Sequence, residues 1–205
     1  MTSLTAPQHD DKTVTFADVV PTARILRILA ISGSLRQVSS NTALLQAAVA
    51  LSPEFVEIHL YGGLGDLPHF NPDLESAELP SVTDLRAQVK WADGIIISSP
   101  EYAHGVPGVL KNALDWLVSG EEFMGKPVAL FNASPRATHS QASLIEIVTT
   151  MAGRIVPEAC ITVSLLGKTL DAAGILSEPE ISGELSAAIV AFTKGIESST
   201  AAYSS

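Results

Sequence analysis

Five short apolar runs alternate with segments of helical periodicity, and this alternation limits the possible folds more than any other feature of the chain. The runs are predicted as strands over residues 27–32, 55–61, 95–97, 128–131 and 160–163, and the helices over 40–51, 80–91, 107–118, 141–151 and 181–197. Each connection is long enough for a crossover, so the strands are expected to be parallel, with helices on both faces. The sequence therefore predicts an α/β fold with a doubly wound, five-stranded parallel sheet.

Length and composition indicate one compact domain, and the net charge limits the partners that it can bind. The chain has 205 residues, of which 46% are hydrophobic and 17% charged, enough to bury a full core. We expect this domain at residues 25–198, between a mobile N-terminal tail over 1–24 and a C-terminal tail over 199–205. The formal net charge of −10 argues against general affinity for nucleic acid or anionic membrane. An anionic ligand would therefore have to be held by a local group of cations.

Cysteine and histidine usage limits the chemistry. The single cysteine, Cys160, excludes an internal disulfide and lies in an apolar run, where we expect a buried, inert thiol. The five histidines are scattered without ligand spacing, so no metal site is predicted. Residues 1–24 have no apolar core and contain three aspartates, which fits neither a signal peptide nor a membrane span. These features predict a cytoplasmic protein.

A polar loop follows the first predicted strand and precedes a helix. It carries hydroxyl donors at Ser34, Ser39 and Ser40, an amide at Asn41 and a forked cation at Arg36, and it has no acidic residue. A helix start also carries partial positive charge and unpaired N–H groups, which favour a phosphate. The alternative is an ordinary strand-to-helix turn in which Ser39 or Ser40 caps the helix.

Two further loops follow the third and fourth strands. Residues 98–108 contain two prolines and two glycines, and Tyr102 offers a flat apolar face for a ring. Residues 132–139 are again polar and contain a proline. Ligands of doubly wound sheets bind beyond the carboxyl ends of the strands, where all three loops are expected. The set suggests a phosphorylated planar ligand, with flavin mononucleotide (FMN) as the obvious candidate.

Two motifs together resemble the NAD(P)H-dependent FMN reductase family, whose quinone, azo-dye and chromate reductases share the flavodoxin-like fold. They are Gly-Ser-Leu-Arg-x-x-Ser-x-Asn after the first strand, and Pro-Glu-Tyr followed by Val-Pro-Gly-Val-Leu-Lys-Asn-Ala-Leu-Asp-Trp after the third. The resemblance covers roughly residues 27–196. It implies that the first loop holds the FMN phosphate and that the other two border the isoalloxazine ring. The cofactor-binding candidates are Ser34, Arg36, Ser39, Ser40, Asn41, Pro100, Glu101, Tyr102, Ala103, His104 and Ser134.

The chain departs from the family pattern at two places. Ala103 follows Pro-Glu-Tyr where the family often has asparagine, and Arg136-Ala137-Thr138 stands where the family often has a glycine-rich loop. Two roles stay open for Arg136: a surface salt bridge, or a contact to the phosphate of a nicotinamide cofactor. No role is assigned to the loop over 62–72.

The resemblance implies an FMN-dependent oxidoreductase that transfers a hydride from NADPH or NADH to N5 of FMN and then passes electrons to a small acceptor. The acceptor would be a quinone, azo dye, metal oxyanion or free flavin, and no catalytic side chain is required. The alternative is a flavodoxin-like one-electron carrier between proteins, but flavodoxins typically lack an arginine in the phosphate loop, so Arg36 favours the enzyme. The resemblance and the apolar helix with Trp116 also suggest a homodimer or homotetramer, and we expect this helix to supply packing or a subunit contact rather than catalysis.

The sequence motifs of P-loop proteins, Rossmann dinucleotide-binding proteins and G-x-S-x-G hydrolases are incomplete or absent in this sequence. Residues 120–127 match a P-loop until Pro127, which lacks the hydroxyl that binds magnesium, and they follow a helix where a strand is required. No G-x-G-x-x-G follows the first strand, and no G-x-S-x-G elbow occurs.

Overall fold

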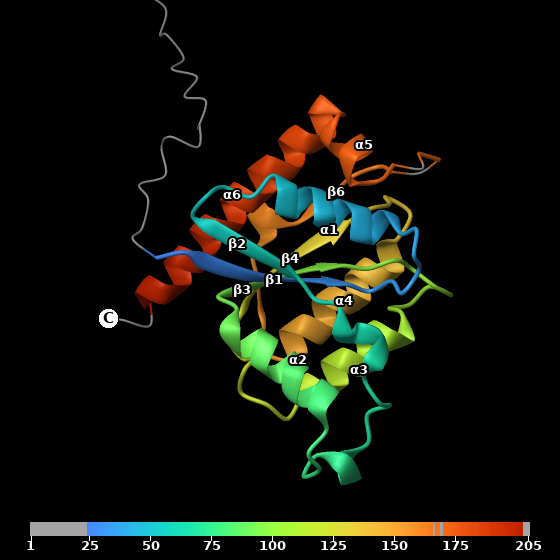
Figure 1. Ribbon diagram of the computed structural model, residues 1–205, viewed down its shortest axis with the longest axis vertical. Coiled ribbons are helices and arrows are strands. Elements are labelled where there is room, and N and C mark those ends of the chain that lie inside the picture. Colours follow the sequence, from blue (N-terminus) through green and yellow to red (C-terminus); the bar gives the residue numbers. More distant parts are fainter. Residues whose placement is uncertain (1–23, 166, 169, 203–205) are drawn as a thin grey trace, which may run out of the picture.

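A computed structural model describes residues 24–165, 167–168 and 170–202. Its centre is a parallel sheet with the strand order β2-β1-β3-β4-β5, to which β6 is added beside β4 (Figure 1). The strands are β1 (Leu26–Ser32), β2 (Val56–Leu60), β3 (Gly94–Ser98), β4 (Pro127–Asn132), β5 (Arg154–Ile155) and β6 (Ile161–Thr162). The predicted doubly wound parallel sheet is confirmed.

The fifth strand position is shared by two short strands. β5 pairs with the beginning of β4 and β6 with its end, and a 3₁₀ turn over Pro157–Ala159 separates them. Proline has no N–H for the ladder, so a single continuous strand is interrupted there. The predicted run over 160–163 therefore corresponds to β6, whereas β5 was not predicted.

Helices cover both faces of the sheet. Alternate residues of β1 point to opposite faces: Ile28 and Ala30 pack in one core, and Leu29 and Ile31 in the other. Helices α1, α5 and α6 lie over the first core, and α2, α3 and α4 over the second (Figure 1). The helices are α1 (Ser40–Ala50), α2 (Pro80–Trp91), α3 (Gly108–Leu117), α4 (Thr138–Thr150), α5 (Ala172–Leu176) and α6 (Pro179–Ala202).

Several boundaries differ from the prediction. Helix α4 begins at Thr138 rather than 141, α5 was not predicted, and α6 continues to Ala202, four residues into the expected C-terminal tail. Arg24, assigned to the N-terminal tail, forms an ion pair with Asp93 of the domain. The remaining tail residues, 1–23 and 203–205, lie outside the described part of the chain.

The loop after β2 is held against α3 by side chains of the second family-like motif. Asn112 accepts a hydrogen bond from the Phe70 N–H (2.7 Å) and donates one to the Pro68 carbonyl (2.9 Å). The Trp116 indole N–H donates to the same carbonyl (2.8 Å), and its ring meets Phe70 edge to face. Trp116 is only 1% exposed, so its role is packing rather than a subunit contact.

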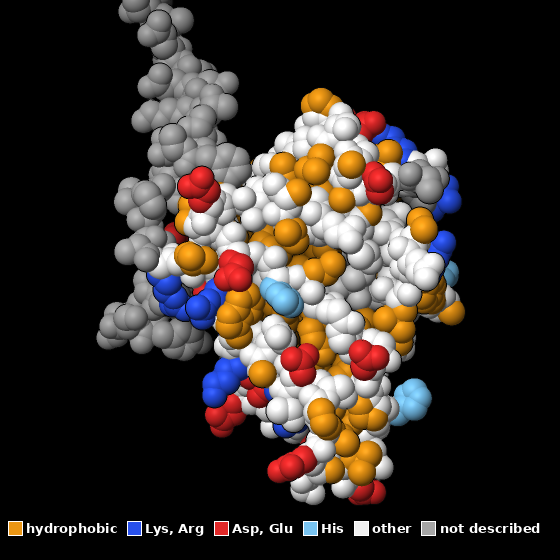
Figure 2. All heavy atoms as spheres, in the orientation of Figure 1, with side chains coloured by type: hydrophobic (Ala, Val, Ile, Leu, Met, Phe, Trp, Pro, Cys, Tyr) orange, Lys and Arg blue, Asp and Glu red, His pale blue; other side chains and the backbone are white. Residues whose placement is uncertain are grey.

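The three polar loops leave the sheet at one edge. The carboxyl ends of β1, β3 and β4 all point to the right in Figure 1. Figure 2 shows acidic side chains spread over the visible face and Lys and Arg side chains near its left and right margins. None of the helices in the described ranges has the length and hydropathy needed to cross a bilayer.

Candidate functional site

A cavity of about 520 Å³ lies between the loops that follow β1, β3 and β4. Its lining includes six of the predicted site residues together with parts of the segment that precedes α5. The lining residues are Arg36, Val38, Ser40, Asn41, Ser99, Pro100, Glu101, Asn132, Ala133, Ser134, Arg136, Ala137, Leu165, Gly167, Lys168 and Leu170.

The β1 loop is shaped by its own hydroxyl groups. The Ser34 N–H donates to the Ser32 hydroxyl (3.4 Å), and the Arg36 N–H donates to the Ser34 hydroxyl (3.3 Å). Ser39 is the N-cap of α1 and accepts a hydrogen bond from the Thr42 N–H (3.3 Å). Ser34 and Ser39 thus act on the backbone, whereas the Arg36 side chain is exposed and lines the cavity.

Space beside Gly33, at the start of this loop, is limited by side chains of α3 and of the β3 loop. A Cβ at Gly33 would lie 3.0 Å from both Leu110 Cδ2 and Ser99 Oγ, tighter than ordinary contacts. The Gly33 N–H donates to the Ser98 carbonyl (2.8 Å), which extends the β1–β3 ladder into the loops.

Asn41 is oriented by a buried contact from the neighbouring strand. The Ser98 hydroxyl donates to the Asn41 side-chain oxygen at 3.0 Å, and both residues are buried. This bond uses the acceptor of the amide, so its NH₂ group remains as a donor at the cavity wall. Sequence analysis singled out Asn41 but not Ser98, whose contact depends on the parallel pairing of β1 and β3.

Glu101 joins the β3 loop to helix α4. Its carboxylate accepts a hydrogen bond from the Ser140 N–H (2.9 Å), one of the N–H groups that a helix start leaves unpaired. The Ser140 hydroxyl donates to the Pro100 carbonyl (3.1 Å). Residue 137, at the cap position of α4, is an alanine without a capping side chain. Glu101 therefore replaces the missing cap from another loop.

Tyr102, Ala103 and His104 form an exposed turn beside the cavity and are not among its lining residues. Tyr102 and Gly105 exchange backbone hydrogen bonds of 3.2 and 3.0 Å, and Ala103 and His104 between them have φ of 49° and 59°. Two consecutive positive φ angles define a type I′ turn, which normally prefers Asn and Gly. The His104 ring stacks on His139 of α4, with 4.3 Å between ring centroids.

The β4 loop repeats the hydrogen-bond pattern of the β1 loop. The Ser134 N–H donates to the Asn132 side-chain oxygen (3.1 Å), and the Arg136 N–H donates to the Ser134 hydroxyl (3.2 Å). In both loops the last strand residue orients a serine, and that serine orients an arginine two residues later. The shared spacing of Ser32-Gly-Ser-Leu-Arg36 and Asn132-Ala-Ser-Pro-Arg136 is visible in the sequence, and it would have identified Asn132 and Arg136 as site residues.

Arginine pairing distinguishes this cavity from the rest of the surface. All six arginines of the chain lie in the described ranges, and four have partners: Arg24 with Asp93, Arg27 over the Trp91 ring, Arg86 with Glu122, and Arg154 with the Gly195 carbonyl. Within the described part of the chain, the guanidinium groups of the other two, Arg36 and Arg136, have no acidic partner. Both line the same cavity, so it carries unneutralised positive charge although the whole chain carries −10.

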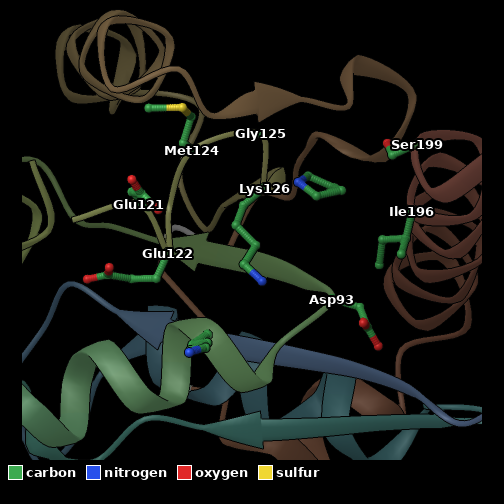
Figure 3. A pocket seen from close by; sticks show the side chains of 10 residues that line it. Asp93, Glu121, Glu122, Met124, Gly125, Lys126, Ile196 and Ser199 are labelled. Carbon is green, nitrogen blue, oxygen red and sulfur yellow. The ribbon is translucent and has the colours of Figure 1, made fainter. Parts of the chain in front are cut away.

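A larger cavity of about 990 Å³ opens at the opposite edge of the sheet, near the amino ends of β3 and β4 (Figure 3). Two of its charged side chains have contacts within the chain: Lys126 donates to the Ala92 carbonyl, and Glu122 meets Arg86 Nε at 3.4 Å. Burial lowers the pKa of Lys126. Ligands of such sheets bind at the carboxyl edge, so the smaller cavity is the better candidate despite its size.

Neither the cysteine nor any group of potential metal ligands in the described ranges forms a second functional site. Cys160 is half-buried, and its sulfur accepts a hydrogen bond from the Leu130 N–H (3.4 Å). Burial raises the pKa of this thiol, which fits the expected inert cysteine. In the described ranges, no three His, Cys, Asp or Glu side chains are grouped as metal ligands would be.

Comparison with known proteins places these features in a family. Residues 26–165 match the family model for NADPH-dependent FMN reductases. The chain is 40% identical over 112 residues to an NAD(P)H-dependent FMN reductase of Pseudomonas aeruginosa, a match that covers 53% of this chain and 60% of that protein. It is 35% identical over 150 residues to the NADH:(hydroxy)cinnamate reductase subunit CrdA of Vibrio ruber, covering 70% and 72%.

A solved structure shows a similar backbone. The flavoenzyme NAD(P)H:(acceptor) oxidoreductase FerB of Paracoccus denitrificans superposes with a TM-score of 0.70 and 28% identity, over 85% of this chain and 98% of that one. The sheet order and this likeness identify the fold as flavodoxin-like. Together with the match over residues 26–165, they show that the chain belongs to the NADPH-dependent FMN reductase family.

Proposed function

We propose that this protein is an FMN-dependent oxidoreductase that takes a hydride from NADPH or NADH and reduces a small acceptor such as a quinone, azo dye, metal oxyanion or free flavin. The observation that carries the proposal is the carboxyl-edge cavity, in which two loops of the same local geometry each contribute an arginine without an acidic partner. The matched segment spans only 60% of the Pseudomonas relative. The activity of that whole protein is therefore a proposal for this chain.

The β1 loop fits a phosphate. Arg36 supplies a forked cation, Ser40 a hydroxyl, and Asn41 an amide donor that is already oriented by Ser98. The start of α1 adds partial positive charge at the same place, and the loop contains no acidic residue to oppose a dianion. We assign the FMN phosphate to this group, with Ser34 and Ser39 holding the loop in shape.

The β3 and β4 loops fit the ring system. Pro100, Glu101 and Ser134 line the same cavity as the phosphate loop, and the turn with Tyr102, Ala103 and His104 follows Glu101 in the chain. When bound, FMN supplies the hydride-accepting chemistry of the reaction. The chain contributes position: the Glu101–Ser140 and Ser98–Asn41 bonds hold three loops in one arrangement before any ligand enters. Because the Glu101 carboxylate is bound to a helix N–H, we assign it no acid–base role.

Assembly and location are further parts of the proposal. We propose a homodimer or homotetramer; with Trp116 buried, this proposal depends on the family alone. We propose a cytoplasmic location, which a single half-buried cysteine fits.

Anaerobic mixing of the purified protein with FMN and NADPH, followed near 450 nm, tests the activity. A reductase bleaches the flavin within the mixing experiment and regains the oxidised spectrum when menadione is added. A one-electron carrier requires a separate reductase, so a spectrum that stays oxidised with both NADPH and NADH would contradict the proposed function.

A further inference from the structure

We infer that Arg136 forms a second anion-binding subsite in the cavity, separate from the FMN phosphate, and that this subsite takes an anionic group of a substrate. The group would be the 2′-phosphate of NADPH or an acidic substituent on the electron acceptor. The inference rests on the proposed function, because it names the substrate chemistry that the same cavity selects.

The β1 and β4 loops share one local geometry. Ser34 and Ser134 accept hydrogen bonds from the N–H groups of Arg36 and Arg136 at 3.3 and 3.2 Å. The backbone therefore has the same local conformation before each arginine. In the sheet order, β1 and β4 lie on either side of β3. The two loops thus leave the sheet two strand spacings apart, about 10 Å, which is wider than one phosphate.

The charge of the cavity also favours a second anion. An arginine that faces a ligand cavity without an acidic neighbour favours an anion there, and this cavity has two such residues in a chain of net charge −10. FMN brings one phosphate, which the β1 loop accounts for. Lys168 also lines the cavity, and its bond to Glu178 (3.2 Å) joins two side chains that are each 45% exposed. Exposed pairs of this kind contribute little, so Lys168 can turn to an anion at low cost.

Acidic side chains that could pair with Arg136 are few among the described residues that line the cavity. Glu101 is the one acidic residue among the described residues that line the cavity, and its carboxylate already accepts the Ser140 N–H. Among the described residues no ion pair joins Glu101 to Arg136, and the lining carries three cationic side chains against this one carboxylate. Pro135 and the Ser134 hydrogen bond limit the backbone freedom of the loop, which reduces the entropy cost of binding.

The test compares Arg136→Gln with two matched variants, Arg36→Gln in the phosphate loop and Arg27→Gln far from the cavity. In FMN-loaded protein, calorimetry measures binding of 2′,5′-ADP and 5′-AMP, which differ by the 2′-phosphate. It also measures binding of 1,2-naphthoquinone-4-sulfonate and 1,2-naphthoquinone, which differ by the sulfonate. Titration of ligand-free protein with FMN supplies the readout for the phosphate loop.

We expect Arg136→Gln to weaken the anionic member of at least one pair about tenfold relative to its partner, while FMN affinity stays within about twofold of wild type. A loss confined to 2′,5′-ADP identifies the NADPH phosphate as the source, and a loss confined to the sulfonate identifies the acceptor. Arg27→Gln should change none of these values, and Arg136→Lys should retain part of the preference.

Two results would overturn the subsite. One is a loss of FMN affinity in Arg136→Gln as large as in Arg36→Gln, which would place both arginines on one phosphate. The other is an unchanged preference within both ligand pairs. The proposed function fails separately, if wild-type protein does not reduce bound FMN with either nicotinamide; the binding titrations still decide the subsite in that case.

Discussion

Glu101 shows how one side chain serves both folding and the site. Its carboxylate lies at the cavity wall and also supplies the cap that α4 lacks at residue 137. From the Pro-Glu-Tyr motif we predicted only that Glu101 lies beside the isoalloxazine ring of FMN. The contact to Ser140, 39 residues further along the chain, depends on where α4 begins and has no local sequence signal.

Glu101→Ala should destabilise the protein by about 1 kcal/mol, because the Ser140 N–H loses its acceptor and the start of α4 loses a favourable charge. Glu101→Gln keeps an acceptor oxygen and should lose less. Glu146→Ala, an exposed change within α4, is the matched control and should stay within about 0.5 kcal/mol of wild type. Urea unfolding measures all three, and equal stability of Glu101→Ala and wild type would exclude the capping role.

Tyr61 carries a hydroxyl that is buried without a hydrogen-bond partner among the described residues. Burial, with smaller effects of Asp84 and Asp66, raises the pKa of Tyr61 from 10.0 to about 12. The folded protein therefore keeps this proton to a higher pH than the unfolded chain does. The group adds no pH dependence below about pH 10, and it lowers stability as the pH rises from 10 towards 12.

Tyr61→Phe should raise the free energy of unfolding by about 1 kcal/mol at pH 7, because it removes an unsatisfied buried polar group. It should also reduce the loss of stability between pH 10 and 12. Chemical unfolding across this range measures both effects, with Tyr102→Phe at an exposed position as the control. A destabilised Tyr61→Phe at pH 7 would show that the hydroxyl has a partner after all.

At the scale of elements, the turn from Tyr102 to Gly105 is the strained part of the site. Ala103 has a φ of 49°, a conformation that costs a residue with a Cβ about 1 kcal/mol or more. We therefore expect Ala103→Gly to stabilise the protein by about 1 kcal/mol. Ala87→Gly, in the exposed interior of α2, should destabilise it by a similar amount. Thermal unfolding of the two variants should show shifts of opposite sign; a loss in both would mean the turn is not strained.

Elements with a strong local signal were predicted well. β3 and β4 are buried along their whole length, and their continuous apolar runs are typical of central parallel strands. β5 has two residues and α5 has five, too few for periodicity to be visible. The Asn112 and Trp116 contacts to Pro68 depend on tertiary packing, so the motif indicated a family without revealing this role.

In the whole molecule, the cavities at the two edges of the sheet differ in chemistry as well as in size. The larger cavity at the amino edge is lined by acidic and basic side chains together, whereas the smaller one at the carboxyl edge contains two arginines without acidic partners. The crossover topology explains why three loops from distant parts of the sequence meet there. Sequence reasoning placed these loops together because parallel strands end at one edge, but it did not reveal which side chains face the cavity.

Use of the 520 Å³ cavity by both substrates predicts ping-pong kinetics. The reduced nicotinamide and the acceptor should occupy the same space in turn, so double-reciprocal plots at several acceptor concentrations should be parallel, and NADP⁺ should compete with the acceptor. Steady-state rates with NADPH and menadione measure this. Intersecting lines with non-competitive NADP⁺ would indicate a separate acceptor site.

The central claim is that the β1 loop binds the phosphate of FMN through Arg36. Titration of the ligand-free protein with FMN and with riboflavin, for wild type and Arg36→Ala, tests it most directly, because the two ligands differ only in that phosphate. We predict that wild type binds FMN much more tightly than riboflavin, and that Arg36→Ala weakens FMN binding by about 1.5–3 kcal/mol with little change for riboflavin. Equal affinity of wild type for both ligands, or an equal loss for both in Arg36→Ala, would contradict the claim.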